Sequence, residues 1–167
     1  MKKYFEVTVE KESLIFSAAH FITFGEKELI CEAIHGHNYR VACEVRGTLD
    51  QHACVIDFIW LRDRLQEFSS QLDHHVLLPQ QHAQIHVREI DDHVEVQFEK
   101  RRWVFPANEV KLLPIENTTA ERLAEWIGQQ LFDEIQKLEG TQISLLRVGV
   151  DENEGQWAWC CWEEATQ

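Results

Sequence analysis

Residues 31–39 read CEAIHGHNY, and this stretch places two histidines, His35 and His37, two positions apart. Side chains at positions i and i+2 of a β-strand point to the same face, so both imidazoles can reach one ion. A third histidine, His20, closes the upstream segment 16–20 (FSAAH), and an adjacent strand would bring it beside the pair. Three neutral nitrogens suit Zn²⁺ and leave a fourth position open, which is the catalytic rather than the structural pattern.

Other interpretations of the histidines compete with this one. Spacing alone leaves metal binding and an ordinary polar pair equally open. Cupins also use His-x-His on a strand, but they follow it with a glutamate four or five positions later, where this chain has Val41 and Ala42. Five histidines without a metal-like partner at fixed spacing are interpreted as ordinary polar residues. These are His52, His75, His82, His86 and His93.

Composition narrows the class of protein. The chain has 167 residues, 44% of them hydrophobic, which predicts a single folded domain over residues 1–167. A formal charge of −13 argues against nucleic acid or an anionic membrane as the main partner. We find no secretory signal and no apolar run of about 18 residues, so no membrane span is expected. Five cysteines, an odd number with an adjacent pair, favour a reducing cytoplasm over a disulfide framework.

Hydrophobic periodicity predicts the secondary structure. Alternating apolar residues predict strands at 5–9, 14–20, 41–47, 142–151 and 156–163. Spacing of three and four predicts helices over 58–72, capped by Asp57, and from Thr118 to about 138, stopped by Gly140. Between the helices, residues 79–114 alternate again and are interpreted as an inserted β-hairpin or three short strands. This order predicts an α+β domain with helices on one face of an antiparallel sheet.

The last predicted strand is apolar on both faces. Trp157 and Trp159 lie on one face and Trp162 on the other. Burial on both sides is expected, with one face on the helices and the other on a neighbouring subunit.

Cys31 lies four residues before His35. A thiol near Zn²⁺ and imidazoles has its thiolate stabilised, so it could act as a base or nucleophile. Two alternatives remain open: a small buried hydrophobic residue, or the fourth ligand of a closed structural zinc site.

Three further groups could carry chemistry. Asp73 beside His74 could hold a proton-transfer imidazole in one tautomer, although a histidine at a helix end needs no such role. Residues 118–121 (TTAE) form a capping-box sequence whose helix N-terminus also offers free N–H groups. Glu152 lies in line with two valines, where burial is costly unless a ligand with parallel donors pairs with it or the strand ends in solvent.

Together these pieces resemble one family, the 6-pyruvoyl-tetrahydropterin synthase / 6-carboxytetrahydropterin synthase family. The resemblance covers roughly residues 4–78 and 115–163. Six motifs occur in the family's order, which makes it more specific than any single motif. They are FSAAH at 16–20, Cys31-x3-His35-Gly-His37-Asn-Tyr39, VIDF at 55–58, LDH at 72–74, TTAE at 118–121 and VDE at 150–152.

The resemblance implies a T-fold, a four-stranded antiparallel sheet with two helices on one face, here with an inserted β-hairpin at about 79–114. It implies trimers or hexamers with active sites at subunit interfaces. It also implies Zn²⁺ as cofactor and 7,8-dihydroneopterin triphosphate as substrate.

The resemblance also assigns roles residue by residue. His20, His35 and His37 match the zinc ligands. Cys31 matches the catalytic cysteine, and Asp73 and His74 match the proton-relay pair. Thr119, Glu121 and Glu152 match positions that bind the pterin, with Glu152 as its anchoring carboxylate.

The Cys-x3-His spacing resembles bacterial 6-carboxytetrahydropterin synthases of queuosine-precursor synthesis, which release acetaldehyde and triphosphate. A 6-pyruvoyl product, and a non-catalytic pterin or purine binder, remain alternatives. The chain departs from the pattern at Thr118, where bacterial members commonly have proline, and in the 79–114 insert, which compact members lack.

Overall fold

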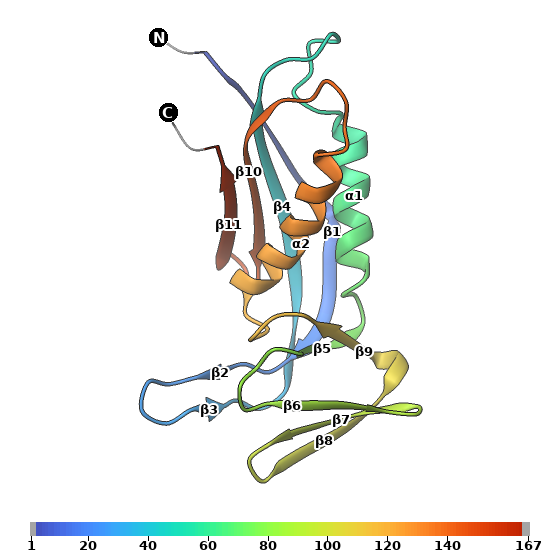
Figure 1. The fold of residues 1–167 in the computed structure, drawn as a ribbon, viewed down its shortest axis with the longest axis vertical. Coiled ribbons are helices and arrows are strands. Elements are labelled where there is room, and N and C mark those ends of the chain that lie inside the picture. The colour runs from blue at the N-terminus through green and yellow to red at the C-terminus, as the bar shows by residue number, and fades with distance from the viewer. Residues whose placement is uncertain (1–2, 165–167) are drawn as a thin grey trace.

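The computed structural model describes residues 3–164, with long strands, two α-helices and a group of short strands between the helices (Figure 1). The helices are α1 (Phe58–Ser70), α2 (Ala120–Ile135) and the short 3-10 helix η1 (Ala107–Glu109). The long strands are β1 (Phe5–His20), β4 (His35–Gly47), β10 (Ile143–Asp151) and β11 (Trp157–Glu163). The short strands are β2 (Thr23–Phe24), β3 (Ile30–Cys31), β5 (His75–Pro79), β6 (His86–Ile90), β7 (His93–Phe98), β8 (Arg101–Pro106) and β9 (Val110–Leu113).

The main sheet has six strands in the order β11-β10-β4-β1-β5-β9. Its first four strands are antiparallel, as predicted, but β5 pairs with β1 and β9 pairs with β5 in parallel. The prediction of a four-stranded antiparallel sheet is therefore wrong for one edge. Strands β5 and β9 are only five and four residues long, too short for alternation to show in the sequence.

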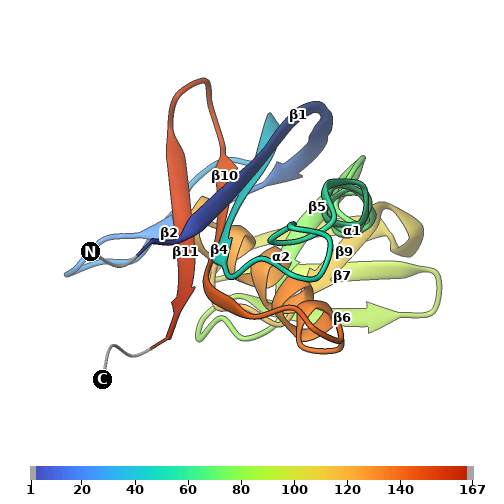
Figure 2. The same cartoon turned by 90° about the horizontal axis from the view of Figure 1, so that it is seen from above.

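Both helices lie on one side of the β1-β4-β10-β11 part of the sheet (Figure 2). Helix α1 begins as predicted, because the Asp57 side chain accepts hydrogen bonds from the backbone N–H groups of Ile59 and Trp60. Helix α2 differs from its prediction. Thr119 is its N-cap residue, while Thr118 is fully buried and its hydroxyl donates to the Phe21 carbonyl. The capping box is therefore not formed, because the Thr118 side chain is used to join α2 to the end of β1.

The predicted inserted hairpin is a three-stranded antiparallel sheet, β6-β7-β8, and β9 returns the chain to the main sheet. The alternative of three short strands was the correct one. This small sheet lies at the end of the main sheet, on the side of β2 and β3 (Figure 1). A second apolar core joins this small sheet to the β2–β3 pair. Its buried members are Phe21, Cys31, Leu78, Ile85, Val94, Val96 and Phe98.

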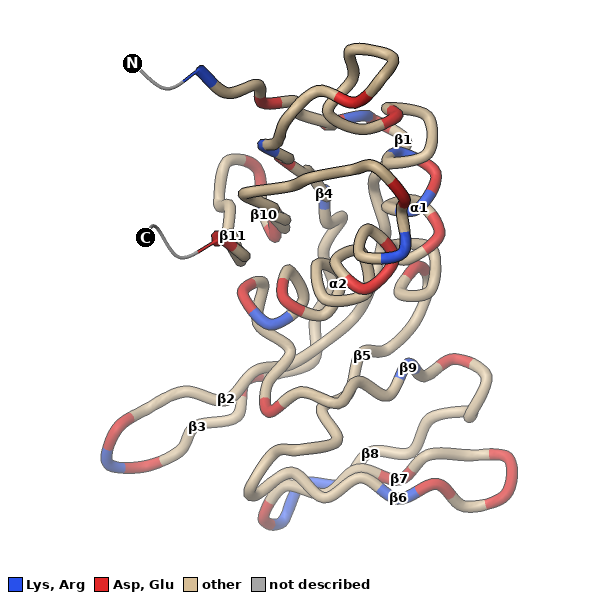
Figure 3. Tube along the Cα trace, turned by 45° about the horizontal axis from the view of Figure 1, so that its top comes forward, with Lys and Arg blue, Asp and Glu red and all other residues tan. Residues whose placement is uncertain are grey.

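Within residues 3–164 the charged positions form no basic stripe. Lys and Arg positions are dispersed among the Asp and Glu positions of the trace (Figure 3). Within residues 3–164, every helix is too short or too polar to cross a bilayer.

Strand β11 covers α2 with one face, as predicted. The Trp162 ring lies so close to Gly128 of α2 that a Cβ there would be 2.4 Å from it. On the other face Trp157 and Trp159 stack with their centroids 5.5 Å apart, and both remain half-buried in the single chain. That this face covers a neighbouring subunit stays a prediction.

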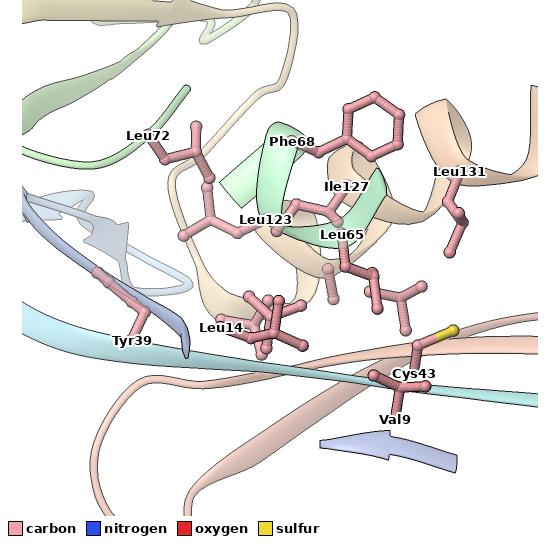
Figure 4. Close-up of a cluster of buried hydrophobic side chains, with 14 of the residues drawn as sticks. Val9, Leu14, Tyr39, Cys43, Leu65, Phe68, Leu72, Leu123, Ile127 and Leu131 are labelled. Carbon is pink, nitrogen blue, oxygen red and sulfur yellow. The ribbon is translucent and has the colours of Figure 1, made fainter. Parts of the chain in front are cut away.

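The main core fills the space between the helices and the sheet (Figure 4). Leu65 of α1 and Leu123 and Ile127 of α2 are fully buried there, against Leu14 of β1 and Tyr39 of β4. Burying such side chains contributes about 1.5–3 kcal/mol each. The core thereby fixes β1 against β4, and the end of β1 and the start of β4 carry the three predicted metal ligands.

Candidate functional site

Three histidines meet where β1 ends and β4 begins. His20 is the partner of His35 in the antiparallel register, and His37 is the partner of Ala18. The three imidazoles present ligand atoms that all lie within 4.8 Å of one another. The predicted convergence of the three histidines is confirmed, since the strand pair places all three rings on one face. Cys31 does not join this group among the described residues, which disfavours the closed four-ligand zinc site.

Backbone carbonyls fix the tautomers of two of these rings. His20 Nδ1 lies 2.8 Å from the Thr118 carbonyl, and His35 Nδ1 lies 3.0 Å from the Ala33 carbonyl. A carbonyl oxygen only accepts, so each Nδ1 carries the proton and each Nε2 has a free lone pair. This arrangement is typical of metal-binding histidines.

The Nε2 atom of His20 supplies an independent test of the metal site. It is buried and has no hydrogen-bond partner. Glu152 Oε1 lies 3.1 Å away, but the contact is not aligned as a hydrogen bond, and a lone pair facing a carboxylate is repulsive. A divalent cation between the imidazoles and Glu152 would remove this conflict, so the donor set fits a metal ion.

Electrostatics favour the ligand forms of these groups. Burial lowers the pKa of His37, which keeps its ring neutral. The Glu152 carboxyl lies 3.1 Å from His20 Nε2 and 3.8 Å from His37 Nε2. An anion beside three imidazoles adds to the attraction for a cation.

The three predicted pterin-binding residues line one cavity. Thr119 and Glu121 come from the start of α2 and Glu152 from the end of β10, and the cavity has a volume of about 410 Å³. Asp151, which the sequence analysis overlooked, shapes the turn that holds Glu152. It is buried and accepts hydrogen bonds from the N–H groups of Gly155 and Gln156.

The predicted relay pair is formed at the start of β5. Asp73 Oδ2 lies 2.9 Å from His74 Nδ1, and Asp73 Oδ1 accepts from the Ser17 N–H at 2.8 Å. Although partial burial acts in the opposite direction, the Ser17 and His74 contacts lower the pKa of Asp73. His74 has a φ of +58°, in the left-handed region that side chains other than glycine rarely adopt.

The single chain does not gather all the predicted catalytic residues in one cavity. His74 opens onto a second cavity of about 410 Å³, which it shares with His37. Cys31 borders neither this cavity nor the one lined by Glu152. Within residues 3–164 of one chain, the thiol and the relay pair are therefore separate.

Cys31 lies in β3 and is 8% exposed. Its thiol donates to the Glu32 carbonyl at 3.6 Å. Burial raises the pKa of the thiol, Arg101 opposes that shift and Glu32 adds to it. The resting thiol is therefore protonated at neutral pH.

Glu32 is a second acidic group at the site that the sequence analysis did not single out. Its Oε1 accepts from the Ile22 N–H at 2.8 Å and lies 3.8 Å from His35 Nδ1. The signal in the sequence was a carboxylate directly after Cys31. Glu32 places a carboxylate 3.8 Å from one of the three histidines, in the residue that follows Cys31.

Comparisons with known proteins agree with this arrangement. Residues 7–163 match the family model described as 6-pyruvoyl tetrahydropterin synthase. A relative from Methanocaldococcus jannaschii, provisionally named 6-carboxy-5,6,7,8-tetrahydropterin synthase, is 33% identical over 146 residues, covering 87% of this chain and 88% of that protein.

Solved structures agree as well. The 6-pyruvoyl tetrahydropterin synthases of Plasmodium vivax and Plasmodium falciparum each share 29% identity, with TM-scores of 0.89 and 0.90. Both matches cover 98% of this chain and 100% of the other, a share that takes in the 79–114 insert. Two variants of the P. vivax protein, with a glutamate described as a catalytic residue replaced by alanine or cysteine, match with a TM-score of 0.89.

Proposed function

The chain belongs to the 6-pyruvoyl tetrahydropterin synthase family, and we propose that it is a zinc-dependent lyase acting on 7,8-dihydroneopterin triphosphate. One observation carries the proposal: the ring nitrogens of His20, His35 and His37 converge, two of them with the proton locked on Nδ1. Zinc held there would act as a Lewis acid on the hydroxyl oxygens of the substrate side chain and acidify the neighbouring C–H.

The cavity beside this centre suits the pterin ring. Glu152 is an ionised carboxylate, and the amino-pyrimidinone edge of a pterin offers two parallel donors to it. Thr119 and Glu121 line the same cavity at the N-terminus of α2. Anchoring the ring there would hold the substrate side chain near the imidazoles and restrict its motion.

Proton transfer is assigned to Cys31 and to the Asp73–His74 pair. Because Asp73 faces His74 Nδ1, the imidazole Nε2 is left to accept or donate a proton. Cys31 must lose its proton before it acts as a base. The two groups lie apart in one chain, so we propose that a trimer or hexamer brings the relay pair of one subunit to the thiol of the next.

Glu32 is a candidate for the base in its own right. A glutamate is described as a catalytic residue in the P. vivax relative, where it was also replaced by cysteine. In this chain Cys31 and Glu32 are consecutive, and the Glu32 carboxylate lies 3.8 Å from His35 Nδ1. The proton from the substrate side chain could therefore pass to either group, and the choice bears on the product.

The favoured product is 6-carboxy-5,6,7,8-tetrahydropterin, with release of acetaldehyde and triphosphate. The Cys-x3-His spacing and the provisional name of the M. jannaschii relative support this branch. The 6-pyruvoyl product is the alternative, because the Plasmodium relatives carry that name.

Product analysis tests the proposal. Zinc-loaded protein is incubated with 7,8-dihydroneopterin triphosphate, and the pterins and acetaldehyde are identified by mass spectrometry. Carboxypterin with acetaldehyde supports the first branch and pyruvoyl-pterin the second, while tight binding without turnover would indicate a non-catalytic pterin binder. Cys31→Ala and Glu32→Gln, assayed separately, identify the base; unchanged turnover in both would contradict the mechanism.

A further inference from the structure

Arg101 of β8 joins the inserted sheet to the segment that carries Cys31. Its Nη1 donates to the Cys31 carbonyl at 2.6 Å and its Nη2 donates to the Glu32 carbonyl at 3.0 Å. The planar guanidinium offers two N–H groups in a fixed fork, and here the fork spans two consecutive carbonyls. We call these two hydrogen bonds the Arg101 brace.

The brace and the thiol share an acceptor. The Glu32 carbonyl that receives Arg101 Nη2 also receives the Cys31 thiol at 3.6 Å. When the thiol loses its proton, this contact would turn into repulsion between sulfur and carbonyl oxygen. A guanidinium bound to the same oxygen offsets that repulsion, and it does so without moving the chain.

Aromatic stacking holds the guanidinium in place. It lies over the Trp103 ring at 4.6 Å from the centroid, and Trp103 stacks on Phe21 at 4.8 Å. Phe21 is fully buried and directly follows the metal ligand His20. The guanidinium of Arg101 is thus held by two hydrogen bonds and by the Trp103 ring, although part of the side chain faces solvent.

The charges around the thiol are few. Arg101 is the cation whose charge acts on the thiol and Glu32 is the anion.

We propose that Arg101 is a positioning residue for the pterin reaction: it holds the Cys31–Glu32 segment against the metal centre and stabilises the thiolate form of Cys31. The inserted sheet would then serve the reaction by carrying this residue. The proposal rests on the proposed function for the role of Cys31, but its action on the thiol can be measured without any substrate.

The test measures the alkylation rate of Cys31 by iodoacetamide between pH 6 and 10, read from its own peptide by mass spectrometry. In Arg101→Gln we expect the inflection of the Cys31 profile to move to higher pH. In Arg101→Lys, which keeps the charge and loses the fork, the inflection should return toward that of the wild type. Arg102→Gln is the matched control, since Arg102 lies next in β8 and pairs with Glu95 instead.

Turnover supplies the second measurement. Arg101→Gln should lower kcat by about tenfold to a hundredfold with KM nearly unchanged, because a displaced catalytic group reduces the rate and leaves ring binding intact. Arg101→Lys should recover part of kcat. If Arg101→Gln fails to fold, Arg101→Lys still tests the inference. It keeps the charge and loses the fork, so we expect a kcat below that of the wild type together with a nearly normal alkylation profile of Cys31.

An Arg101→Gln protein with the thermal stability, thiol profile and kcat of the wild type would overturn the inference. The two proposals fail differently. A shifted thiol profile in a protein without pterin turnover would leave the Arg101 action on the thiol standing and remove the proposed function. Normal pterin turnover in the wild type, together with an unchanged Cys31 profile and an unchanged kcat in Arg101→Gln, would support the proposed function and remove the role of Arg101.

Discussion

His20 Nε2 lies 3.1 Å from Glu152 Oε1, and the two atoms make no hydrogen bond. The proton of His20 is committed on its other nitrogen to the Thr118 carbonyl. A buried lone pair and a carboxylate therefore face each other at the candidate metal site. The metal-free protein bears this cost in stability, whereas a bound cation converts both groups into attractive partners.

Glu152→Gln should accordingly raise the Tm of the metal-free protein, because a glutamine amide can donate to His20 Nε2. The same change should weaken pterin binding, since it removes the anionic anchor. Scanning calorimetry of metal-free protein and titration with a pterin measure the two effects. Glu154→Gln is the control, as the Glu154 side chain is 88% exposed. A Tm that falls in metal-free Glu152→Gln would contradict the account.

Zinc should stabilise the wild-type chain by mass action. At a free zinc concentration one hundred times Kd, the expected gain is about 2.7 kcal/mol in the free energy of unfolding. His37→Ala removes one ligand and should abolish most of this gain, while His52→Ala should keep it. Zinc content by atomic emission and Tm with and without zinc check the prediction. Equal gains in the two variants would place the metal elsewhere.

The sequence predicted the convergence of the three histidines better than it predicted the sheet edge. His35 and His37 share a face by the geometry of any strand, so their convergence needed only the correct secondary structure. Strands β5 and β9 were not predicted as parts of the main sheet, because runs of four or five residues carry too little periodicity. The brace from Arg101 could not be predicted, because it joins residues 70 positions apart through a pairing that only the folded insert creates.

The cap of α2 shows a different limit. TTAE at 118–121 satisfies the local capping pattern, but Thr118 points into the protein to the Phe21 carbonyl. A tertiary contact therefore overrides a local preference. The Thr118 carbonyl gains a role at the same time, because it receives the His20 proton that fixes the ligand tautomer.

Gly128→Ala should destabilise the protein. In an exposed helix this change commonly adds about 1 kcal/mol of stability, because alanine is the better helix former. Here the new Cβ would lie 2.4 Å from the Trp162 ring. Overpacking of this kind costs about 1–3 kcal/mol, so the sign reverses. Urea unfolding measures the change, and Gln129→Ala on the exposed face is the control. A Gly128→Ala protein more stable than the wild type would mean that β11 does not pack on α2 as described.

His82 should make the stability of the insert dependent on pH. Its Nδ1 accepts from the N–H groups of Gln84 and Ile85, and its Nε2 lies 2.8 Å from the Thr23 hydroxyl. This arrangement requires the neutral ring, and burial lowers the pKa of His82. The folded state therefore binds the proton less readily than the unfolded state. The His82 hydrogen bonds therefore contribute fully to the stability of the folded state above about pH 6.5, the ordinary pKa of histidine. This contribution is lost as the pH falls through the lowered pKa of the folded state.

Hydrogen exchange of the β6–β8 segment at pH 7.5 and pH 5.5 measures this dependence. Wild-type protein should exchange faster at the lower pH, after correction for the intrinsic rate. His82→Asn should show a smaller difference between the two pH values, and His52→Asn should behave as the wild type. A pH response that survives unchanged in His82→Asn would assign it to another group.

Replacements of His74 should separate backbone strain from catalysis. The residue has a φ of +58°, and the left-handed region costs a residue with a Cβ roughly 1–2 kcal/mol. His74→Ala and His74→Gly both remove the imidazole from Asp73, so their difference isolates the backbone. We expect the glycine variant to be the more stable by about 1 kcal/mol in urea unfolding. Both should lose pterin turnover by about a hundredfold or more, because the relay is gone. Equal stabilities would mean that the strain is absent, whereas turnover retained by either variant would remove His74 from the mechanism.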